Sequence, residues 1–192
     1  IKSQKIFWQH NLKAISAFLT TKNINKILSE LKLPKMIGII SLDIDGVDYW
    51  IMKKIKYLSP TVFICEYNGI FGKLKKITVP DKNNFSRNKE HYSNLYFGAS
   101  IEAFKDLLKK DYYFLGTNSA GNNAFFVKKK YKSFFSKKIQ EITVFNTKFR
   151  ESRNKKNKLN YLNNNRAKSL IKNKFIINLE NNKKVRLKEI KV

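Results

Sequence analysis

The fold is decided by residues 37–55, which read IGIISLDIDGVDYWIMKKI. The stretch opens with a continuous apolar run of the kind that is buried on both faces of a parallel sheet. Three acids, Asp43, Asp45 and Asp48, follow within six residues, and apolar residues then recur at helical spacing. Gly46 permits a sharp turn between the two patterns. The stretch therefore predicts a buried strand, an acidic turn and a helix.

The segments on either side continue the alternation of strand and helix. Such alternation predicts an α/β sheet with right-handed crossovers. Ser100 has the side chain and the position to cap the helix that follows it. The other predicted elements are a strand at 12–20, a helix at 21–34, a strand at 61–68, a helix at 100–111 and an antiparallel strand pair at 112–119 and 123–129.

The amino-acid composition changes near residue 131, beyond which apolar core residues are scarce and lysine and asparagine are abundant. A chain of 192 residues has the length of one domain with or without a tail. We predict a partial α/β domain at 1–130 and a basic C-terminal extension at 131–192, with a terminal hairpin about Glu180.

The net charge is +26, from 40 lysines and arginines against 14 acids. Such a charge suits a polyanionic partner such as nucleic acid. The excess is nearly all lysine, however, whereas nucleic-acid readers favour the arginine fork. Lysine, asparagine and isoleucine together are what AT-rich codons supply, and we favour that coding bias as the explanation. We expect no specific nucleic-acid partner.

The number of cysteines and the hydropathy of the chain indicate the compartment in which the protein is expected. A single cysteine, Cys65, permits neither an intrachain disulfide nor a cysteine-based zinc site, and it fits a reducing compartment. No apolar run approaches the length of a membrane span. We therefore expect a cytoplasmic location and no membrane span.

The acidic turn carries the first candidate site residues. Asp43 and Asp45 fall at the carboxyl end of the predicted strand, where ligands bind in open α/β sheets. Asp48 falls in the first helical turn, where the helix dipole favours an anion, and Asp45 could serve the same purpose. Asp43 has the stronger functional claim, because a carboxylate that closes a buried strand needs donors or a cation. The cluster could hold Mg²⁺ or Ca²⁺, but acidic strand ends are common without metal, and we predict none.

Residues 41–55, SLDIDGVDYWIMKKI, resemble the strand, turn and helix of FkbM-type S-adenosylmethionine-dependent methyltransferases. The family pattern there reads Lys-hydrophobic-Asp-Val-Glu-Gly-Ala-Glu. Asp43 matches its Asp, Asp45 its first Glu, Gly46 its Gly and Asp48 its second Glu. The resemblance covers about residues 22–153. It extends to EYNGIFG, ITVPDKNNFSRNKEHYSNLYFGAS, NSAGNNAFFV and FRESR, which are similar to a poorly characterised bacterial group often linked with surface-polysaccharide genes.

The resemblance implies a Rossmann-like methyltransferase sheet, mostly parallel with an antiparallel terminal strand pair. In that fold a Gly-rich turn and an acid on the first two strands hold S-adenosylmethionine. This chain has no Gly-x-Gly, and few residues precede its first helix. We therefore expect a fragment that lacks the N-terminal strands. Asp43 would be its only cofactor contact, and S-adenosylmethionine would bind only the full-length protein.

Residues 69–98 form a long irregular segment, which is typical of a functional loop. The resemblance implies that this loop covers the acceptor. Asp43 and His91 are the predicted catalytic residues, with His91 as general base because its ordinary pKa lies near working pH. Arg87 could pair a substrate carboxylate or phosphate. The predicted substrate-binding residues are Asp45, Glu66, Tyr67, Asn68, Arg87, Tyr92 and Asn118.

Structural roles compete with these functional ones. A lone loop histidine such as His91 is more often a hydrogen-bonded surface residue. Tyr92, Tyr96 and Phe97 could be loop anchors rather than a platform for a sugar ring. Asn118 belongs to a stretch whose glycine and asparagines suit a turn.

Three functions remain in view. The first is a methyltransferase that acts on a sugar or another small polar acceptor in surface-glycan synthesis. The second is a methyltransferase-like binding module that does not bind the cofactor. The third is a basic nucleic-acid-binding protein, ranked last because no helix-turn-helix, zinc finger or RNA-recognition motif is recognisable.

Overall fold

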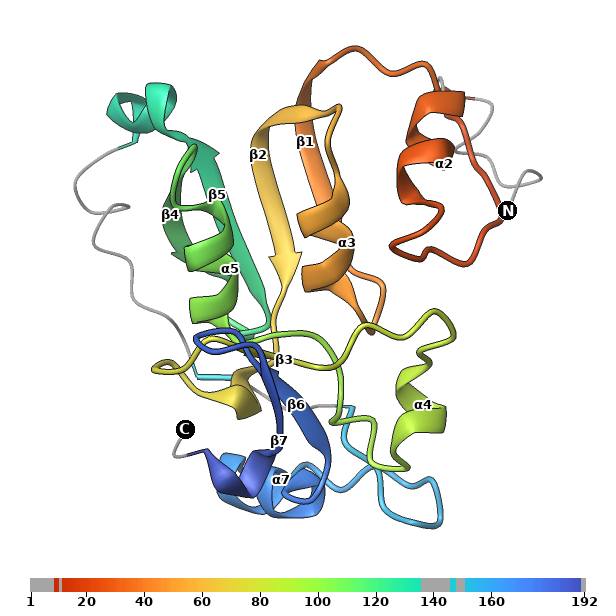
Figure 1. Cartoon of the computed structure of the whole chain (residues 1–192), viewed down its shortest axis with the longest axis vertical. Helices are drawn as coiled ribbons and strands as arrows, with labels where there is room; N and C mark the ends of the chain where they lie inside the picture. The colour runs from red at the N-terminus through yellow and green to blue at the C-terminus, as the bar shows by residue number, and fades with distance from the viewer. Residues whose placement is uncertain (1–8, 11, 136–145, 148–150, 191–192) are drawn as a thin grey trace.

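The computed structural model describes residues 9–10, 12–135, 146–147 and 151–190 (Figure 1). Its main sheet has four strands in the order β1-β2-β5-β4. Their bounds are β1 Met36–Leu42, β2 Ser59–Glu66, β4 Tyr112–Thr117 and β5 Asn123–Lys128. The chain is therefore a mixed α/β protein, as the alternation of patterns predicts.

The strand directions correct one part of the prediction. β1 and β2 are parallel, whereas β5 is antiparallel to both β2 and β4. The antiparallel terminal pair is confirmed, but a mostly parallel sheet is wrong, because β1–β2 is the only parallel pairing among the described strands of this sheet. The tight turn between β4 and β5 forces an antiparallel hairpin. β5 lies between β4 and β2, so its pairing with β2 is antiparallel as well.

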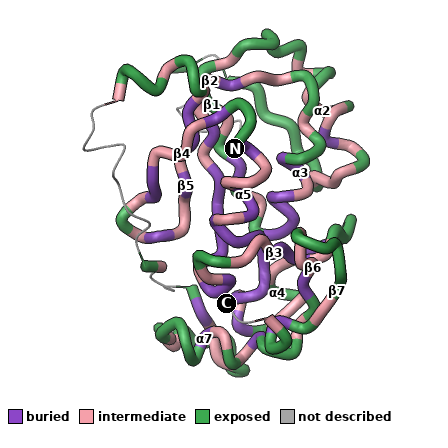
Figure 2. The backbone as a smooth tube through the Cα atoms, turned by 60° about the vertical axis from the view of Figure 1, so that its left-hand side comes forward, coloured by how far each residue is buried: buried purple, intermediate pink, exposed green. Residues whose placement is uncertain are grey.

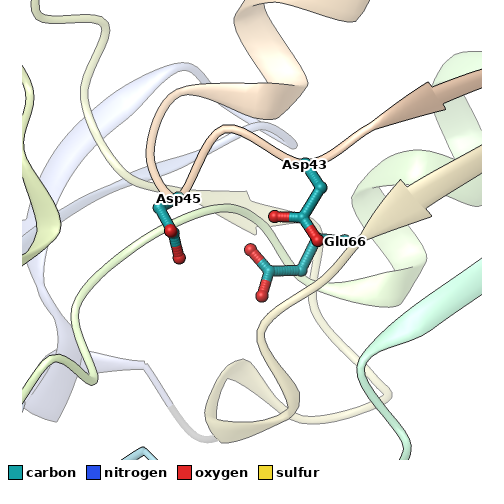
Figure 3. A group of neighbouring side chains, drawn as sticks. All are labelled: Asp43, Asp45 and Glu66. Carbon is teal, nitrogen blue, oxygen red and sulfur yellow. The ribbon is translucent and has the colours of Figure 1, made fainter. Parts of the chain in front are cut away.

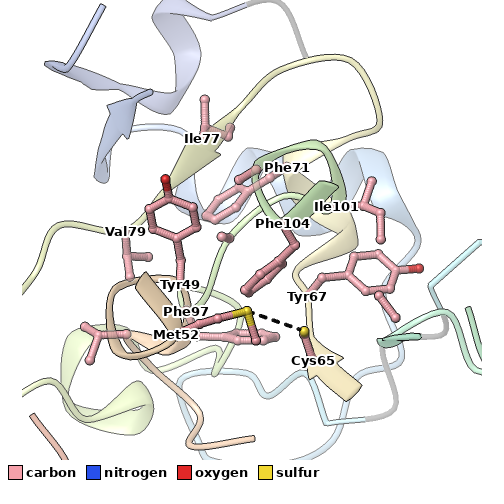
Figure 4. Close-up of a cluster of buried hydrophobic side chains, with 14 of the residues drawn as sticks. Tyr49, Met52, Cys65, Tyr67, Phe71, Ile77, Val79, Phe97, Ile101 and Phe104 are labelled. Atoms are coloured by element: carbon pink, nitrogen blue, oxygen red, sulfur yellow. Dashed lines mark hydrogen bonds between the residues drawn. The ribbon is translucent and has the colours of Figure 1, made fainter. Parts of the chain in front are cut away.

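Helices α3 (Asp48–Lys54) and α5 (Ile101–Leu108) lie on the same face of the main sheet (Figure 1). The predicted cap is confirmed, since the Ser100 side chain accepts a hydrogen bond from the Ala103 N–H. Between helices and sheet lies the core, where Met52, Cys65 and Phe104 pack together (Figure 4). Buried residues gather near the centre of the molecule, around α5 and β3 (Figure 2).

Two predictions at the N-terminal side are wrong. β1 is not buried on both faces, because Ile39, on the face opposite Leu42, is 60% exposed; among the described residues β1 is an edge strand that pairs with β2. Its alternating side chains reach the core from one face only, as at Leu42. Residues 12–20 form no strand, since no neighbouring strand pairs with them. The helix predicted next is present as α2 (Ile24–Glu30).

A second, three-stranded sheet joins two distant parts of the chain. β3 (Ile77–Thr78) comes from the long loop and pairs with β6 (Phe175–Asn178), which continues into β7 (Lys183–Arg186). The predicted terminal hairpin is thus confirmed. Helix α7 (Asn164–Ile171) precedes it, and this part of the chain buries Ile171, Ile176 and Leu187 in the common core. The domain boundary after residue 130 stays a prediction.

The long loop is more ordered than its composition indicates. Besides β3 it contains the 3₁₀ turn Gly69–Phe71 and helix α4 (Arg87–Glu90). Tyr96 and Phe97 are buried and anchor the loop, as one of the two interpretations predicts, whereas Tyr92 is 38% exposed. Further 3₁₀ turns are Lys129–Phe134 and Leu187–Glu189. No helix among the described residues is long and apolar enough to cross a membrane.

Candidate functional site

The turn between β1 and α3 is organised by Asp48. Its fully buried carboxylate accepts hydrogen bonds from the N–H groups of Ile44, at 2.9 Å, and Gly46, at 3.0 Å. Burial raises the pKa of Asp48 to about 6 against the opposing effect of these bonds. Asp45 adopts φ +55°, a left-handed conformation that aspartate tolerates better than most residues. Asp48 therefore shapes the turn, while Asp43 and Asp45 remain exposed.

The parallel register brings a third carboxylate to this turn. Leu42 is paired with Cys65, so the residues that follow them, Asp43 and Glu66, emerge side by side. One carboxylate oxygen from each of Asp43, Asp45 and Glu66 lies within 4.8 Å of the other two. Figure 3 shows the three side chains pointing toward a common space beyond the strand ends. We call these three residues the strand-end triad.

Glu66 is the buried member of the triad. Its side chain is 8% exposed, and its Oε2 atom has no hydrogen-bond partner among the described residues. Burial and then the neighbouring Asp43 raise the pKa of Glu66 to about 9, and Arg87 opposes the rise. Burial and Asp45 raise the pKa of Asp43 as well. At neutral pH the triad therefore holds at least one proton in the absence of another cation.

Arg87, the first residue of α4, is the counter-ion of the triad. Its guanidinium stacks 3.8 Å from the centre of the Phe97 ring, and its Nε–H donates to the Asn94 carbonyl. The Nη1 atom contacts the Asp45 carboxylate and lies 3.9 Å from Oε1 of Glu66. The sequence predicts that Arg87 binds a substrate anion; the structure pairs it with acids of its own chain.

Glu151 completes this group, and sequence reasoning missed it. Its Oε2 atom lies 3.1 Å from Nη1 of Arg87. The sequence FRESR predicts a surface segment whose alternating charges pair among themselves. No local pattern links Glu151 to Arg87, which lies 64 positions earlier. Its position is set by tertiary contacts, such as the hydrogen bond from the Arg153 N–H to the Ser93 carbonyl.

A hollow of about 320 Å³ lies next to the triad. Its wall combines apolar surface with charged groups of the site. The residues that matter for this mixture are Phe18, Ile44, Phe85, Asp45, Arg87 and Glu151. The size and the lining suit a small polar ligand, with apolar contacts on one side and hydrogen-bonding groups on the other.

Tyr67 and Asn68 lie beneath the triad as buried supports. The Asn68 amide donates to the carbonyls of Leu95 and Phe97, and its oxygen accepts from the Ile70 N–H. Tyr67 is 2% exposed, and its hydroxyl bonds to threonine side chains. The sequence predicts that both residues bind substrate; in the structure Asn68 fixes the backbone of the loop, and Tyr67 bonds to Thr117 and Thr147 outside it.

His91, Tyr92 and Asn118 make their contacts within their own segments rather than with the triad. Nδ1 of His91 lies 2.7 Å from the Ser93 hydroxyl, and the His91 ring packs against Tyr92 at 4.5 Å. Burial, followed by Lys174, lowers the pKa of His91. The Asn118 side chain accepts from two backbone N–H groups of its own turn. Of the predicted site residues, the structure brings together Asp43, Asp45, Glu66 and Arg87.

No family model, curated protein or solved structure matches the chain.

Proposed function

We propose that the chain is the acceptor-binding part of an S-adenosylmethionine-dependent methyltransferase that modifies a sugar or another small polar molecule in surface-glycan synthesis. The observation that carries the proposal is the convergence of Asp43, Asp45 and Glu66 beyond the parallel strands β1 and β2, beside an open hollow. Ligands of open α/β sheets bind at such strand ends. Carboxylates accept hydrogen bonds from hydroxyl groups, which a sugar supplies in number.

The strand order supports the same proposal. β4 and β5 follow the parallel pair in the chain, and they add to it as an antiparallel hairpin, with β5 placed between β2 and β4. A parallel part followed by an antiparallel terminal pair is what the FkbM-like resemblance of residues 41–55 implies.

The site residues divide the work on an acceptor hydroxyl. O-methylation replaces the hydroxyl hydrogen, so the released proton needs a base within hydrogen-bond reach. Asp43 is an exposed carboxylate whose pKa is raised, which suits it to accept this proton. Asp45 and Arg87 line the hollow and would orient the acceptor. His91 stays a predicted base.

The residues present do not fit the cofactor itself. Phe85 fills the space at Gly46, the glycine that follows β1, since a Cβ there would lie 2.8 Å from the Phe85 ring. The Thr147 side chain occupies the equivalent space at Gly69, after β2. Neither glycine leaves room for a ligand against its backbone. The proposal therefore places the main cofactor contacts outside this chain. The same observation favours, as a second candidate, a binding module without cofactor.

The test is methyl transfer from radiolabelled S-adenosylmethionine to a panel of sugars and nucleotide sugars, with the full-length protein. Asp43→Asn should reduce turnover by about 100-fold or more. Asp106→Asn, which removes an acid on α5 that pairs with Lys76 and Lys109, is the matched control and should leave turnover unchanged.

The outcomes separate the two candidates. Equal turnover in Asp43→Asn and the parent would remove Asp43 from the reaction. Sugar binding to the 192-residue chain, with no transfer by the full-length protein, would establish the binding module instead.

A further inference from the structure

We propose that the strand-end triad, Asp43, Asp45 and Glu66, is a binding site for a hard divalent cation, Ca²⁺ or Mg²⁺. The proposal goes beyond methyl transfer and does not depend on it. It rests on the spacing of the carboxylate oxygens, on an unpartnered buried oxygen and on the balance of charge.

The spacing of the three oxygens matches a cation of this class. They lie within 4.8 Å of one another. An ion equidistant from three oxygens that are 4.8 Å apart would lie about 2.8 Å from each of them, whereas Ca–O distances are about 2.3–2.6 Å and Mg–O distances about 2.0–2.1 Å. Each oxygen would therefore move by at most about 0.5 Å to bind Ca²⁺ and by about 0.8 Å to bind Mg²⁺.

The second observation is the Oε2 atom of Glu66. Buried polar atoms are nearly always hydrogen-bonded, and an unsatisfied one costs about 1–3 kcal/mol. Oε2 of Glu66 lacks a hydrogen-bond partner in the part of the chain that the structure describes, although its side chain is more than nine-tenths buried. Its carboxylate points into the space shared with Asp43 and Asp45 (Figure 3). A cation in that space would supply the missing partner.

Arg87 does not replace such a cation. Once a cation has displaced the proton of the triad, one guanidinium balances one of the three carboxylates and leaves two negative charges, which one divalent ion balances. The 3.9 Å from Nη1 of Arg87 to Oε1 of Glu66 exceeds hydrogen-bonding distance. Arg87 also has Glu151 at 3.1 Å as an alternative partner on the outer side. It can therefore remain in place while a cation binds the triad.

The net charge of the chain makes the proposal sharply testable. A chain of +26 repels cations in general, so diffuse binding of Ca²⁺ or Mg²⁺ is disfavoured. Stoichiometric binding would require a local cluster of acids. Three protein ligands would leave coordination positions for water or for oxygens of a ligand in the adjacent hollow, which Asp45 also lines.

The experiment is calorimetric titration of the 192-residue chain with CaCl₂, MgCl₂ and MnCl₂ after dialysis against a chelator. We expect one site per chain, with a dissociation constant on the order of 10⁻⁴ to 10⁻³ M. Asp45→Asn and Glu66→Gln, which keep the side-chain volume, should each weaken binding about tenfold or more. Glu180→Gln, whose native carboxylate lies 3.8 Å from Lys75, is the control for lost charge and should bind normally.

Circular dichroism melts establish that each variant is folded before it is titrated. Absence of binding up to roughly 10 mM of all three cations would overturn the proposal. Unchanged affinity in both triad variants would overturn it as well, as would an equal loss in Glu180→Gln. Cation binding without methyl transfer would leave this inference intact while the proposed function fails, so the two are distinguishable.

Discussion

The two ends of the main sheet differ in the kind of charge they carry and in how they hold it. At the carboxyl end of β1 and β2, three carboxylates converge around the buried Glu66, with Arg87 fixed beside them. At the opposite end lies a larger hollow, of about 660 Å³. Its basic lining consists of Lys35, Lys53, Lys56, Lys128, Lys129 and Lys130.

The difference teaches that the size of a hollow and the sign of the net charge are poor guides to this site. Most of the lysines at the amino end are exposed, so each ammonium is hydrated and costs little free energy. The carboxylate of Glu66 is buried without a full set of partners, and that arrangement is costly. A costly group that the rest of the chain does not satisfy is the better indicator of a ligand.

The largest expected effect comes from the turn that presents the triad. Asp48→Ala leaves the part-buried N–H of Ile44 and the buried N–H of Gly46 without an acceptor and should lower the free energy of unfolding by about 3 kcal/mol. Lys54→Ala, on the exposed surface at the lysine-lined end of the same helix, should change it by less than about 0.5 kcal/mol. Urea denaturation measures both, and similar losses would contradict the contrast between the two ends.

A smaller effect is expected from the counter-ion. Arg87→Gln leaves the triad without its cation, and we expect a loss of about 2 kcal/mol in chelator, reduced from a fully buried pair because Asp45 and Glu151 are exposed. Millimolar Ca²⁺ should restore part of that stability, because it would neutralise the same carboxylates. Denaturant curves with and without Ca²⁺ test this; a variant as stable as the parent in chelator would show that Arg87 is not needed there.

The pH dependence of stability sharpens the account of Glu66. Its pKa is raised from 4.5 to about 9, so between these values the folded chain keeps a proton that the unfolded chain releases. The stabilising contribution is complete below pH 4.5 and is lost as pH rises through about 9. Glu66→Gln mimics the protonated form, so in chelator it should gain stability over the parent as pH rises. A pH-independent difference would argue against a protonated Glu66.

The smallest effect is expected at the other end. Replacing Lys128, Lys129 and Lys130 together with glutamine should change Ca²⁺ affinity by no more than about twofold at physiological salt, because the two ends are screened from each other. Calorimetry on this triple variant provides the comparison. A change as large as that in Glu66→Gln would mean that the two ends are electrostatically coupled.

Local patterns predicted the elements that frame the site. The apolar run and helical spacing of residues 37–55 correctly gave β1, the turn and α3, and Ser100 marked the start of α5. The β4–β5 and terminal hairpins followed from turn residues between short apolar runs. Each of these signals acts between residues close in sequence, which is why sequence reasoning reached them.

The remaining features depend on pairings between distant residues. Glu66 meets Asp43 only because Leu42 is in register with Cys65, and no spacing within one segment reveals that register. The exposure of Ile39 depends on what packs against its face of β1, which no local pattern specifies. The contact of Glu151 with Arg87 likewise depends on how the chain returns to the loop.

Paramagnetic broadening by Mn²⁺ is the measurement that tests the central claim most directly. In ¹H–¹⁵N spectra of the chain, traces of Mn²⁺ should first broaden the amide signals of Ile44, Gly46 and Tyr67, which adjoin the triad, and leave those of Lys128 and Lys129 sharp. Ca²⁺ should reverse the effect by competition. Uniform broadening, or broadening that begins elsewhere, would contradict the account that the carboxyl end of the sheet is the ligand site.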